Sequence, residues 1–368
     1  MYYRAMSRLR LHYLFVWPDF SDAGVPRKVA EQTRVWTEFG CEVSVHLLSK
    51  DASASRWQAV VHPSVSTRLY PYASAASRLR SAAAAVAAAI EAGADVLYTR
   101  FDVFMPAFIS ARRAVPIVFE VNSDDVAEDR AAPLARRVYN RLTRGVTLRC
   151  AAGFVFVSRE LAASRSFRRN GVPAEVVSNG IDLATVQPLD PPEGRRTTLV
   201  FIGSRGRDWH GVDKIVKLAR ERPQWAFDVI GLYPSDVPHA PENVTLHGPL
   251  HGGDAVAVMA RAHVAIGTLA MHRNGMDEGS PLKTRQYLAL GLPVIIAYED
   301  TDFPDGAPFL LRLPNVEDNV LPHLHRIDKF VSGWSGRRVD RSAVRCIDSL
   351  EKERRRVAFF QRVARGSP

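Results

Sequence analysis

Short apolar runs alternate with longer amphipathic segments along the chain. Residues 11–17 are apolar and predict a buried strand, after which come a polar loop, PDFSDAG, and a helical pattern over residues 25–39 that ends at Gly40. The apolar run CEVSVHLL then completes a unit of strand, loop, helix and strand. The same order returns over residues 198–231, from TLVFIG through SRGRDWH and a second helical pattern to WAFDVIG. Two such beginnings predict an α/β protein with two doubly wound domains.

The segment QPLDPPEGRR, residues 187–196, separates the two beginnings. Its three prolines, its glycine and its charges suit an exposed linker rather than a helix or a strand. We therefore predict an N-terminal Rossmann-like domain over residues 1–186 and a C-terminal domain over residues 187–368. The Ala-rich residues 81–94 predict a packed surface helix, and residues 342–365 also carry a helical pattern.

Four further apolar runs in the first half end at polar residues and predict strands. They are DVLYTR, PIVFEVN, GFVFVS and AEVVSNGID. The carboxyl ends of parallel strands line the ligand crevice of such a sheet, so by position alone four residues are candidates for the cleft: Arg100, Glu120, Asn122 and Ser158. The alternative is that these polar residues only begin the loops that follow the strands.

The chain is basic, with 49 Lys and Arg against 39 Asp and Glu, and its net charge of +10 favours an anionic partner. Its three cysteines lie far apart, which excludes a disulfide framework or a cysteine-rich zinc site and suits a reducing compartment. The first apolar run is too short for a signal peptide, and no apolar stretch approaches the roughly 20 residues that span a bilayer. We expect a cytoplasmic protein that is at most peripheral on the inner face of the cell membrane.

Almost all of the net positive charge lies between Arg130 and Arg169, a window with ten arginines and one acid, Glu160. At the period of an α-helix it has an apolar stripe of Leu134, Val138, Leu142 and Val146, and a neighbouring face of Arg137, Arg141 and Arg144. Two interpretations stay open: the stripe packs on the sheet while the arginines are solvated, or the segment binds an anionic membrane surface. Because only Tyr139 and Phe167 lie among the arginines, nucleic acid is not expected as a partner.

The segment GMDEGSPLKTRQYLALGLPVI, residues 275–295, carries the most chemistry. Ser280 before Pro281 predicts an N-cap and the start of a helix over residues 281–290, whose first amides and dipole favour an anion such as a diphosphate. Lys283 adds a full positive charge. Just before this helix, Asp277 and Glu278 offer carboxylates that accept hydrogen bonds from sugar hydroxyls. The alternative is that both acids only stabilise the helix N-terminus.

The block from Glu278 to Gln286 resembles the motif of Glu, seven residues and Glu in retaining nucleotide-sugar glycosyltransferases of family four, which have the GT-B fold. Other pieces of this resemblance are the loop Ala23-Gly24-Val25, the strand end at Ser158, the turn SNGID, and FIG followed by HGVD. The resemblance implies two Rossmann-like domains that face across a cleft, an acceptor domain and then a nucleotide-sugar donor domain. It also implies a last helix that packs back on the first domain.

The same resemblance implies a role for each residue of the block. Glu278 is expected to contact the donor sugar as the catalytic residue, and the amides of Gly279, Ser280 and Leu282 to meet the diphosphate. Gln286, where the family usually has Glu, is expected to accept a bond from the ribose.

Outside the block, the resemblance implies that Gly24 brings the first loop close to the donor and that Gly203 opens a diphosphate loop. Two cations of the family are absent from that loop, because Ser204 and His210 stand in their places. We expect Arg205, Arg207 and Lys283 to replace them, and His210 to donate a hydrogen bond whether it is neutral or charged.

The implied reaction is retaining, metal-independent hexosyl transfer from a nucleotide diphosphate sugar to a lipid-linked or saccharide acceptor in cell-surface polysaccharide or glycoconjugate assembly. No cofactor, covalent intermediate or metal is expected, and the nearest Asp-x-Asp forms, Asp124-Asp125 and Asp300-Thr301-Asp302, are interpreted as loop acids. A hydrolase or a dinucleotide oxidoreductase is disfavoured because G-x-S-x-G, H-E-x-x-H and G-x-G-x-x-G are absent. The main alternative is a catalytically degenerate GT-B protein that acts as a binding or regulatory partner. A nucleotide-sugar epimerase would share the fold without support from these motifs.

Overall fold

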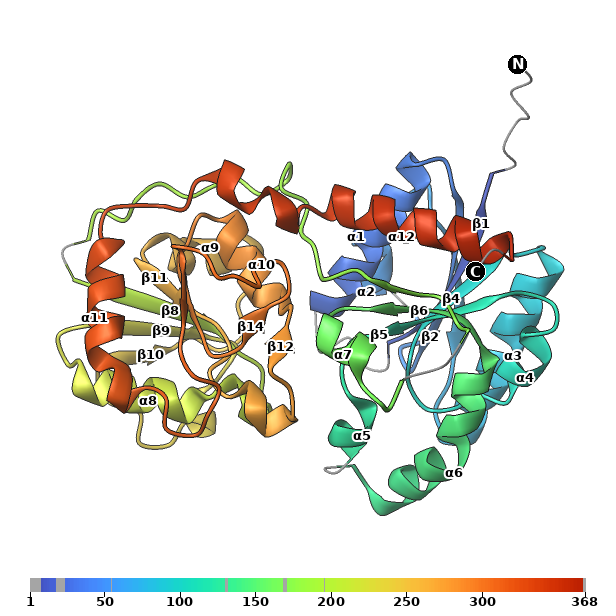
Figure 1. Ribbon diagram of the computed structural model, residues 1–368, viewed down its shortest axis with the longest axis horizontal. Helices are drawn as coiled ribbons and strands as arrows, with labels where there is room; N and C mark the ends of the chain where they lie inside the picture. The colour runs from blue at the N-terminus through green and yellow to red at the C-terminus, as the bar shows by residue number, and fades with distance from the viewer. Residues whose placement is uncertain are drawn as a thin grey trace. The chain divides into compact units, whose positions relative to one another are not determined.

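The computed structural model describes residues 8–17, 24–53, 55–129, 132–167, 171–194 and 196–366. The chain divides into two units. Unit 1 contains residues 1–178 and 349–368, and unit 2 contains residues 179–348. Each unit holds one parallel sheet, which confirms the prediction of two doubly wound α/β domains (Figure 1). Residues 179–186, which the sequence pattern assigned to the first domain, lie in unit 2.

The sheet of unit 1 has seven strands in the order β3-β2-β1-β4-β5-β6-β7, and every neighbouring pair is parallel. The strands are β1 (Arg10–Val16), β2 (Glu42–Ser49), β3 (Ser66–Pro71), β4 (Val96–Arg100), β5 (Ile117–Val121), β6 (Ala151–Phe156) and β7 (Ala174–Val176). The predicted strands of the first half are therefore confirmed, with β3 added at the edge of the sheet. They form because apolar side chains, buried in β1, β4 and β5, face helices on both sides.

The helices of unit 1 are α1 (Gly24–Glu38), α2 (Ser55–Gln58), α3 (Ala75–Glu91), α4 (Ala107–Ala111), α5 (Asp125–Glu128), α6 (Leu134–Cys150), α7 (Arg159–Ala163) and α12 (Ser349–Ala364). Helices α1 and α12 share one core with the sheet, in which Trp36 meets Tyr13 and Phe360. Helix α4 covers the other face, where Phe108 packs on Phe119 of β5. The Ala-rich segment is helical as predicted, and a capping box at Ser74 starts it.

The helical pattern over residues 342–365 forms two elements instead of one helix. A 3₁₀ helix, η6 (Arg341–Ile347), belongs to unit 2, and α12 belongs to unit 1. Asp348 between them has an extended backbone, which ends the first element. Figure 1 shows α12 in red beside α1, where Trp36 donates to Glu353 at 2.7 Å and so fixes the last helix to its own unit.

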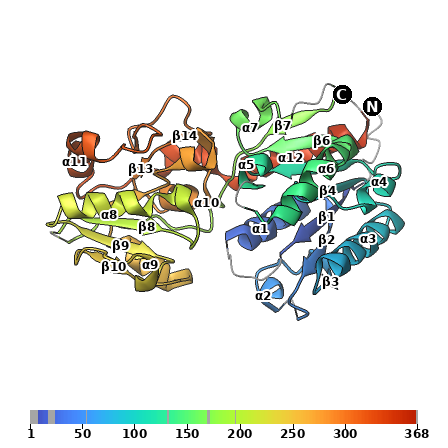
Figure 2. The ribbon, with the colours of Figure 1, turned by 90° about the horizontal axis from the view of Figure 1, so that it is seen from below.

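Unit 2 has a six-stranded parallel sheet in the order β10-β9-β8-β11-β13-β15 and a separate two-stranded pair of β12 and β14. The strands are β8 (Thr198–Ile202), β9 (Ala226–Ile230), β10 (Val244–Leu246), β11 (Val264–Ile266), β12 (Glu278–Gly279), β13 (Val294–Ile296), β14 (Glu299–Asp300) and β15 (Leu310–Arg312). The longer helices are α8 (Val212–Glu221), α9 (Gly252–Ala260), α10 (Leu282–Ala289) and α11 (Leu324–Gly333). Figures 1 and 2 show α8 and α9 on opposite sides of this sheet.

The predicted linker, residues 187–196, forms neither helix nor strand where the structure describes it. It runs along unit 2, since the amide of Leu189 donates to Leu290 and the guanidinium of Arg338 donates to the carbonyl of Asp190. In the described residues, no helix combines the length and the apolar character that crossing a bilayer requires.

Candidate active site

The acidic pair before α10 lies in two different surroundings. Glu278 is buried, with 6% of its surface exposed, and its backbone pairs with Glu299 in the β12 and β14 ladder. Asp277 is exposed and accepts a hydrogen bond from Asn315 at 2.7 Å. Helix α10 begins only at Leu282 and has no acid in its first turn. Neither acid therefore lies in the first turn of α10, and Glu278 is a buried carboxylate shortly before the helix.

Ser280 is not the N-cap of α10. The capping position belongs to Pro281, whose backbone is extended, and no side chain caps this helix. The hydroxyl oxygen of Ser280 instead accepts from the amide of Asn179 at 2.7 Å and from the guanidinium of Arg285 at 3.2 Å. Ser280 does not cap the helix because the buried guanidinium of Arg285 and the partly buried amide of Asn179 use the same oxygen.

Arg285, within the same block, is a fully buried cation that the sequence interpretation did not single out. It donates two hydrogen bonds of 2.8 Å to Asp300, and it lies 3.0 Å from Asp302 and 3.0 Å from the carbonyl oxygen of Asn179. Asp300 and Asp302, the two acids of the Asp-x-Asp form, therefore both pair with the guanidinium of Arg285. Together these contacts tie α10, β14 and the SNGID turn into one rigid corner of unit 2.

Lys283 points a second cation into the same region. Its Nζ is buried and has no hydrogen-bond partner among the described residues, and it lies 4.5 Å from the centre of the Phe201 ring. Burial lowers the pKa of Lys283 to about 7. A buried cation that only an aromatic face accompanies is poised to accept an anion, because an incoming phosphate supplies the missing hydrogen bonds.

The burial of Lys283 predicts a pH-dependent stability. The pKa is near 7 in the folded chain and 10.5 ordinarily, so the unfolded chain binds more protons between these values and stability rises with pH there. From about pH 7 to about pH 9 the free energy of unfolding is expected to rise by roughly 2 kcal/mol more in the wild type than in Lys283→Met. Urea unfolding at both pH values measures this, with Lys217→Met on the exposed face of α8 as the control. Equal pH slopes in the wild type and Lys283→Met contradict the prediction.

Phe201, near the end of β8, lies under the Lys283 ammonium and beside the loop that follows the strand. A Cβ on Gly203 would lie 2.6 Å from the Phe201 ring, so a side chain there displaces the ring that supports Lys283. The Phe201 ring also meets His210 edge to face at 5.7 Å. Burial, then Lys283 and Arg207, lower the pKa of His210 to about 2. His210 is therefore neutral.

The amide of Ser204 donates to Nδ1 of His210 at 3.4 Å. In the matching tautomer the hydrogen on Nε2 remains as a donor. The neutral His210 can thus offer the hydrogen bond expected of it, without adding a positive charge.

The two loop arginines differ in their partners. Arg205 forms an ion pair with Asp236 at 2.8 Å, which offsets its charge. Arg207 stacks over the ring of Trp209 at 4.9 Å, and no carboxylate in the described ranges pairs with it. Arg207 and Lys283 are therefore the cations that remain available beside His210. The Gln286 side chain is half-buried and forms no hydrogen bond within the described part of the chain.

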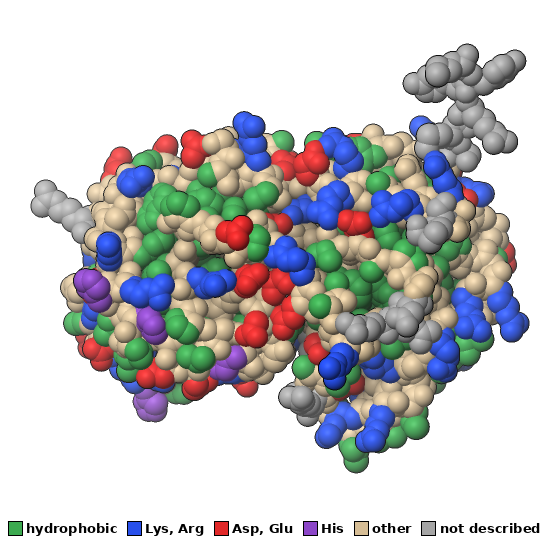
Figure 3. All heavy atoms as spheres, in the orientation of Figure 1, with side chains coloured by type: hydrophobic (Ala, Val, Ile, Leu, Met, Phe, Trp, Pro, Cys, Tyr) green, Lys and Arg blue, Asp and Glu red, His purple; other side chains and the backbone are tan. Residues whose placement is uncertain are grey.

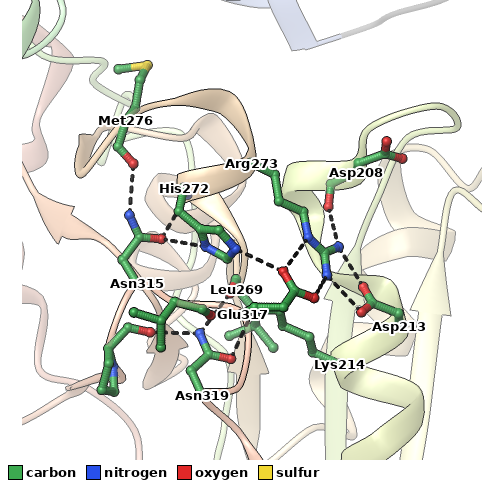
Figure 4. A network of polar contacts seen from close by, with 12 residues as sticks. Asp208, Asp213, Lys214, Leu269, His272, Arg273, Met276, Asn315, Glu317 and Asn319 are labelled. Carbon is green, nitrogen blue, oxygen red and sulfur yellow. Dashed lines mark hydrogen bonds and ion pairs between the residues drawn. The ribbon is translucent and has the colours of Figure 1, made fainter.

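A polar network that the sequence did not reveal fixes the segment leading to Glu278 (Figure 4). Arg273 donates to both carboxylate oxygens of Asp213 at 2.8 and 2.9 Å and to Glu317 at 3.0 Å. Hydrogen bonds from Arg273 and His272 lower the pKa of Glu317 to about 2. Asn315 accepts from the His272 amide and donates to Asp277. Long sequence separations hide this network, which joins the start of α8 to the 3₁₀ helix η4 (Met271–Asn274).

Three of the four cleft candidates of unit 1, Arg100, Glu120 and Asn122, lie together at the ends of β4 and β5. Arg100 is paired in register with Glu120, and Lys28 of α1 donates to Glu120 at 2.9 Å and to Asn122 at 3.1 Å. Arg356 of α12 also approaches Glu120, at 3.5 Å. These cations hold the pKa of the Glu120 carboxyl well below its usual range despite its burial. Glu120 thus ties α1 and α12 to the sheet.

Two other predicted positions of unit 1 have local roles. Ser158 is the N-cap of α7 and accepts a hydrogen bond from the amide of Leu161, so it begins a helix rather than a loop. Likewise, Asp124 caps α5 and Asp125 pairs with Arg144. Gly24 is the first residue of α1. The loop before it, including Ala23, lies outside the described residues.

The first unit gives the clearest relationship to known proteins. Residues 23–185 match the model of Glycosyltransferase Family 4. This match covers less than half of the 368 residues, and it spans the strands and helices from α1 through β7. No curated protein matches the sequence.

Solved structures extend the likeness over nearly the whole chain. The lipopolysaccharide outer core galactosyltransferase WaaB in its apo form is 12% identical, with a TM-score of 0.64 over 96% of this chain and 100% of its own. Alr3699/HepE of Anabaena, in complex with UDP and glucose, is 14% identical, with a TM-score of 0.64 over the same shares. The UDP-GlcNAc 2-epimerase of Neisseria meningitidis, bound to UDP-GlcNAc, is 12% identical, with a TM-score of 0.53 over 96% and 100%. The GT-B fold expected from the resemblance is thus confirmed, and at these identities the likeness shows the fold alone.

Proposed function

We propose that the protein is a retaining glycosyltransferase that moves a hexosyl group from a nucleotide diphosphate sugar to a lipid-linked or saccharide acceptor. The observation that carries the proposal is the buried Nζ of Lys283, which has no hydrogen-bond partner in the described part of the chain, on the helix that follows the buried carboxylate of Glu278. An anion site beside a hydroxyl-binding group is what a sugar phosphate requires. Gly279, Ser280 and Leu282 connect the two and would present their amides to the diphosphate.

In the proposed reaction the bond between the anomeric carbon and the phosphate oxygen breaks, and a bond from the acceptor oxygen forms on the same face. The acceptor hydroxyl proton passes to the leaving phosphate. Negative charge grows on that phosphate, so Lys283, Arg207 and the Nε2 hydrogen of His210 would stabilise the transition state more than the bound donor. No step in this scheme requires a metal ion or a cofactor.

The proposed role in surface-polysaccharide assembly is supported by the similarity of fold to solved structures and by the net charge of the chain. WaaB acts in the lipopolysaccharide outer core by its name, and HepE was solved with UDP and glucose. The net charge of +10 suits an acceptor that carries phosphate or lies at an anionic surface. We extend these properties to the present chain as part of the proposal, with a uridine diphosphate sugar as the first donor to test.

Binding of UDP, GDP, dTDP and ADP, and of representative sugars of each, tests the proposal in the wild type and in Glu278→Ala. Calorimetry is expected to show saturable binding of one nucleotide sugar, with the contribution of the sugar lost in the mutant and that of the nucleotide kept. Proton magnetic resonance of the product then reports whether the anomeric configuration is retained. No binding of any donor by the folded wild type would overturn the proposal.

Two observations favour a degenerate binding protein as the second candidate. His210 is neutral and Arg205 is paired with Asp236, so the loop supplies less positive charge than the family pattern provides. Such a protein would bind a nucleotide without transferring the sugar. An epimerase, whose fold is shared, would release an altered nucleotide sugar with no acceptor present. The product analysis separates the three outcomes.

A further inference from the structure

The first turns of helix α6 present their apolar side chains to the outside, whereas its last turns bury Leu148 and Cys150 in the usual way. Its apolar residues Leu134, Val138 and Leu142 follow one another at single turns and are 71%, 49% and 75% exposed. The interpretation that this stripe packs on the sheet is therefore wrong for these three residues. In a water-soluble domain such side chains normally face the core, so a partner surface is indicated.

The inward face of α6 is held by polar contacts. Asn140 donates to Asp129 at 2.7 Å, and the Tyr139 hydroxyl donates to the carbonyl of Phe104 at 2.9 Å. Arg144 donates to both oxygens of Asp125, at 2.7 and 2.9 Å, and stacks over Phe167 at 4.7 Å. These contacts fix the rotation of the helix, so the outward position of the leucines is built into the fold.

The outward face is also positively charged. Arg137 and Arg141 flank the stripe, are exposed, and form no ion pair with any carboxylate that the structure describes. Arg136 and Arg144, by contrast, pair with acids of their own unit. The arginines that remain free are thus those beside the leucines.

The same character continues onto neighbouring elements. Helix α4 contacts α6, where Arg112 donates to the carbonyl of Arg149 at 3.2 Å. On α4 and directly after it, Ile109, Arg112 and Arg113 are exposed. Among the described residues, ten large hydrophobic side chains are exposed, and five of them lie in this region: Ile109, Val126, Leu134, Val138 and Leu142. Figure 3 shows basic and hydrophobic side chains together at the lower edge of the molecule, over α6.

We propose that this outward face of α6, together with Ile109, Arg112 and Arg113, docks on an anionic lipid bilayer. Apolar side chains that enter the headgroup region while guanidinium groups meet lipid phosphates use both features of the face. The proposal does not rest on the transfer reaction, because none of these residues belongs to the donor site.

Other occupants suit the face less well. A second copy packed through a two-fold axis would bring the unpaired arginines of both copies together, which is repulsive. Single-stranded nucleic acid requires exposed aromatic platforms, whereas Phe167 is buried and Tyr139 is turned inward to bond Phe104. Lipid headgroups require neither an aromatic platform nor a complementary protein surface.

Vesicle flotation tests the proposal with the full chain. The wild type is expected to float with vesicles of equal parts phosphatidylcholine and phosphatidylglycerol but not with pure phosphatidylcholine, and salt should weaken the binding. Leu134→Ser with Leu142→Ser, and separately Arg137→Gln with Arg141→Gln, should each lower the partition coefficient about tenfold or more. Leu321→Ser and Arg345→Gln, exposed residues of unit 2, serve as matched controls.

The substituted side chains are exposed, so unchanged circular dichroism and thermal midpoints are expected and establish that each variant is folded. Three results would overturn the proposal: equal binding to neutral and anionic vesicles, no binding to either, or α6 variants that bind as tightly as the controls. Light scattering adds a fourth. A dimer that becomes monomeric in the leucine variant, without vesicle binding in the wild type, assigns the face to a second copy instead.

Discussion

Glu278→Gln is expected to lower kcat for sugar transfer by about 10²- to 10³-fold while changing the donor KM only slightly. The amide keeps the size of the side chain and one oxygen that accepts from a sugar hydroxyl. It loses the negative charge that faces a sugar on which positive charge develops in the transition state. Because Glu278 is buried in β12, water screens this charge poorly, and its loss is felt strongly.

Asp277→Asn is the matched control for this substitution. It removes the neighbouring carboxylate, which is exposed and accepts from Asn315. Initial rates with the donor identified by binding are expected to differ little from the wild type in this control. If Glu278→Gln retains kcat within about threefold of the wild type, the catalytic role of Glu278 is wrong. Donor binding that also survives in Glu278→Ala would then show that the donor is held by other residues.

The sequence predicted those parts of the fold whose signals are local and repeated. The strands β1, β2, β8 and β9 and the helices α1 and α8 carry long apolar patterns, and all of them form where expected. The edge strand β3 was missed because its sequence, STRLYP, offers only the adjacent pair Leu69 and Tyr70 as an apolar signal. The strands β10, β11, β13 and β15 have only three residues each, too few to show a period.

In the candidate site, too, the sequence predicted the features that depend on neighbouring residues and missed those that depend on distant ones. A short block from Glu278 to Gln286 identified the buried carboxylate and Lys283, because residues close in sequence on one helix start are also close in space. It gave the wrong role to Ser280, since the partners of its hydroxyl come from Asn179 and from within the helix at Arg285. Such contacts depend on how distant segments meet, which no single stretch of sequence records.

Helix α6 shows a limit of a different kind. Its period correctly predicted a helix with one apolar stripe, but the period of a helix does not say which face turns inward. The rotation of α6 is set instead by hydrogen bonds of Asn140, Tyr139 and Arg144 to other segments of unit 1. Polar side chains with partly buried partners can thus outweigh an apolar stripe in setting the rotation of a helix.

The largest effect on stability is expected for Arg285→Leu, at about 3 to 5 kcal/mol of lost unfolding free energy in unit 2. Arg285 and Asp300 are both fully buried and share two hydrogen bonds of 2.8 Å. Replacing only the cation leaves the Asp300 carboxylate buried without its partner, and the desolvation of that charge is no longer offset. The same change removes the donors that Ser280 and Asn179 face.

The double variant Arg285→Leu with Asp300→Leu distinguishes the cost of an unpaired buried carboxylate from the cost of altered packing. It is expected to recover a large part of the lost stability, because no unpaired charge remains buried. The exposed pair of Arg312 and Glu299, 3.5 Å apart, provides the control, and Arg312→Leu should cost less than about 1 kcal/mol. Hydrogen exchange of the α10 amides under increasing urea reports on unit 2 separately from unit 1. A loss in Arg285→Leu no larger than that in Arg312→Leu would show that the buried pair does not hold this corner together.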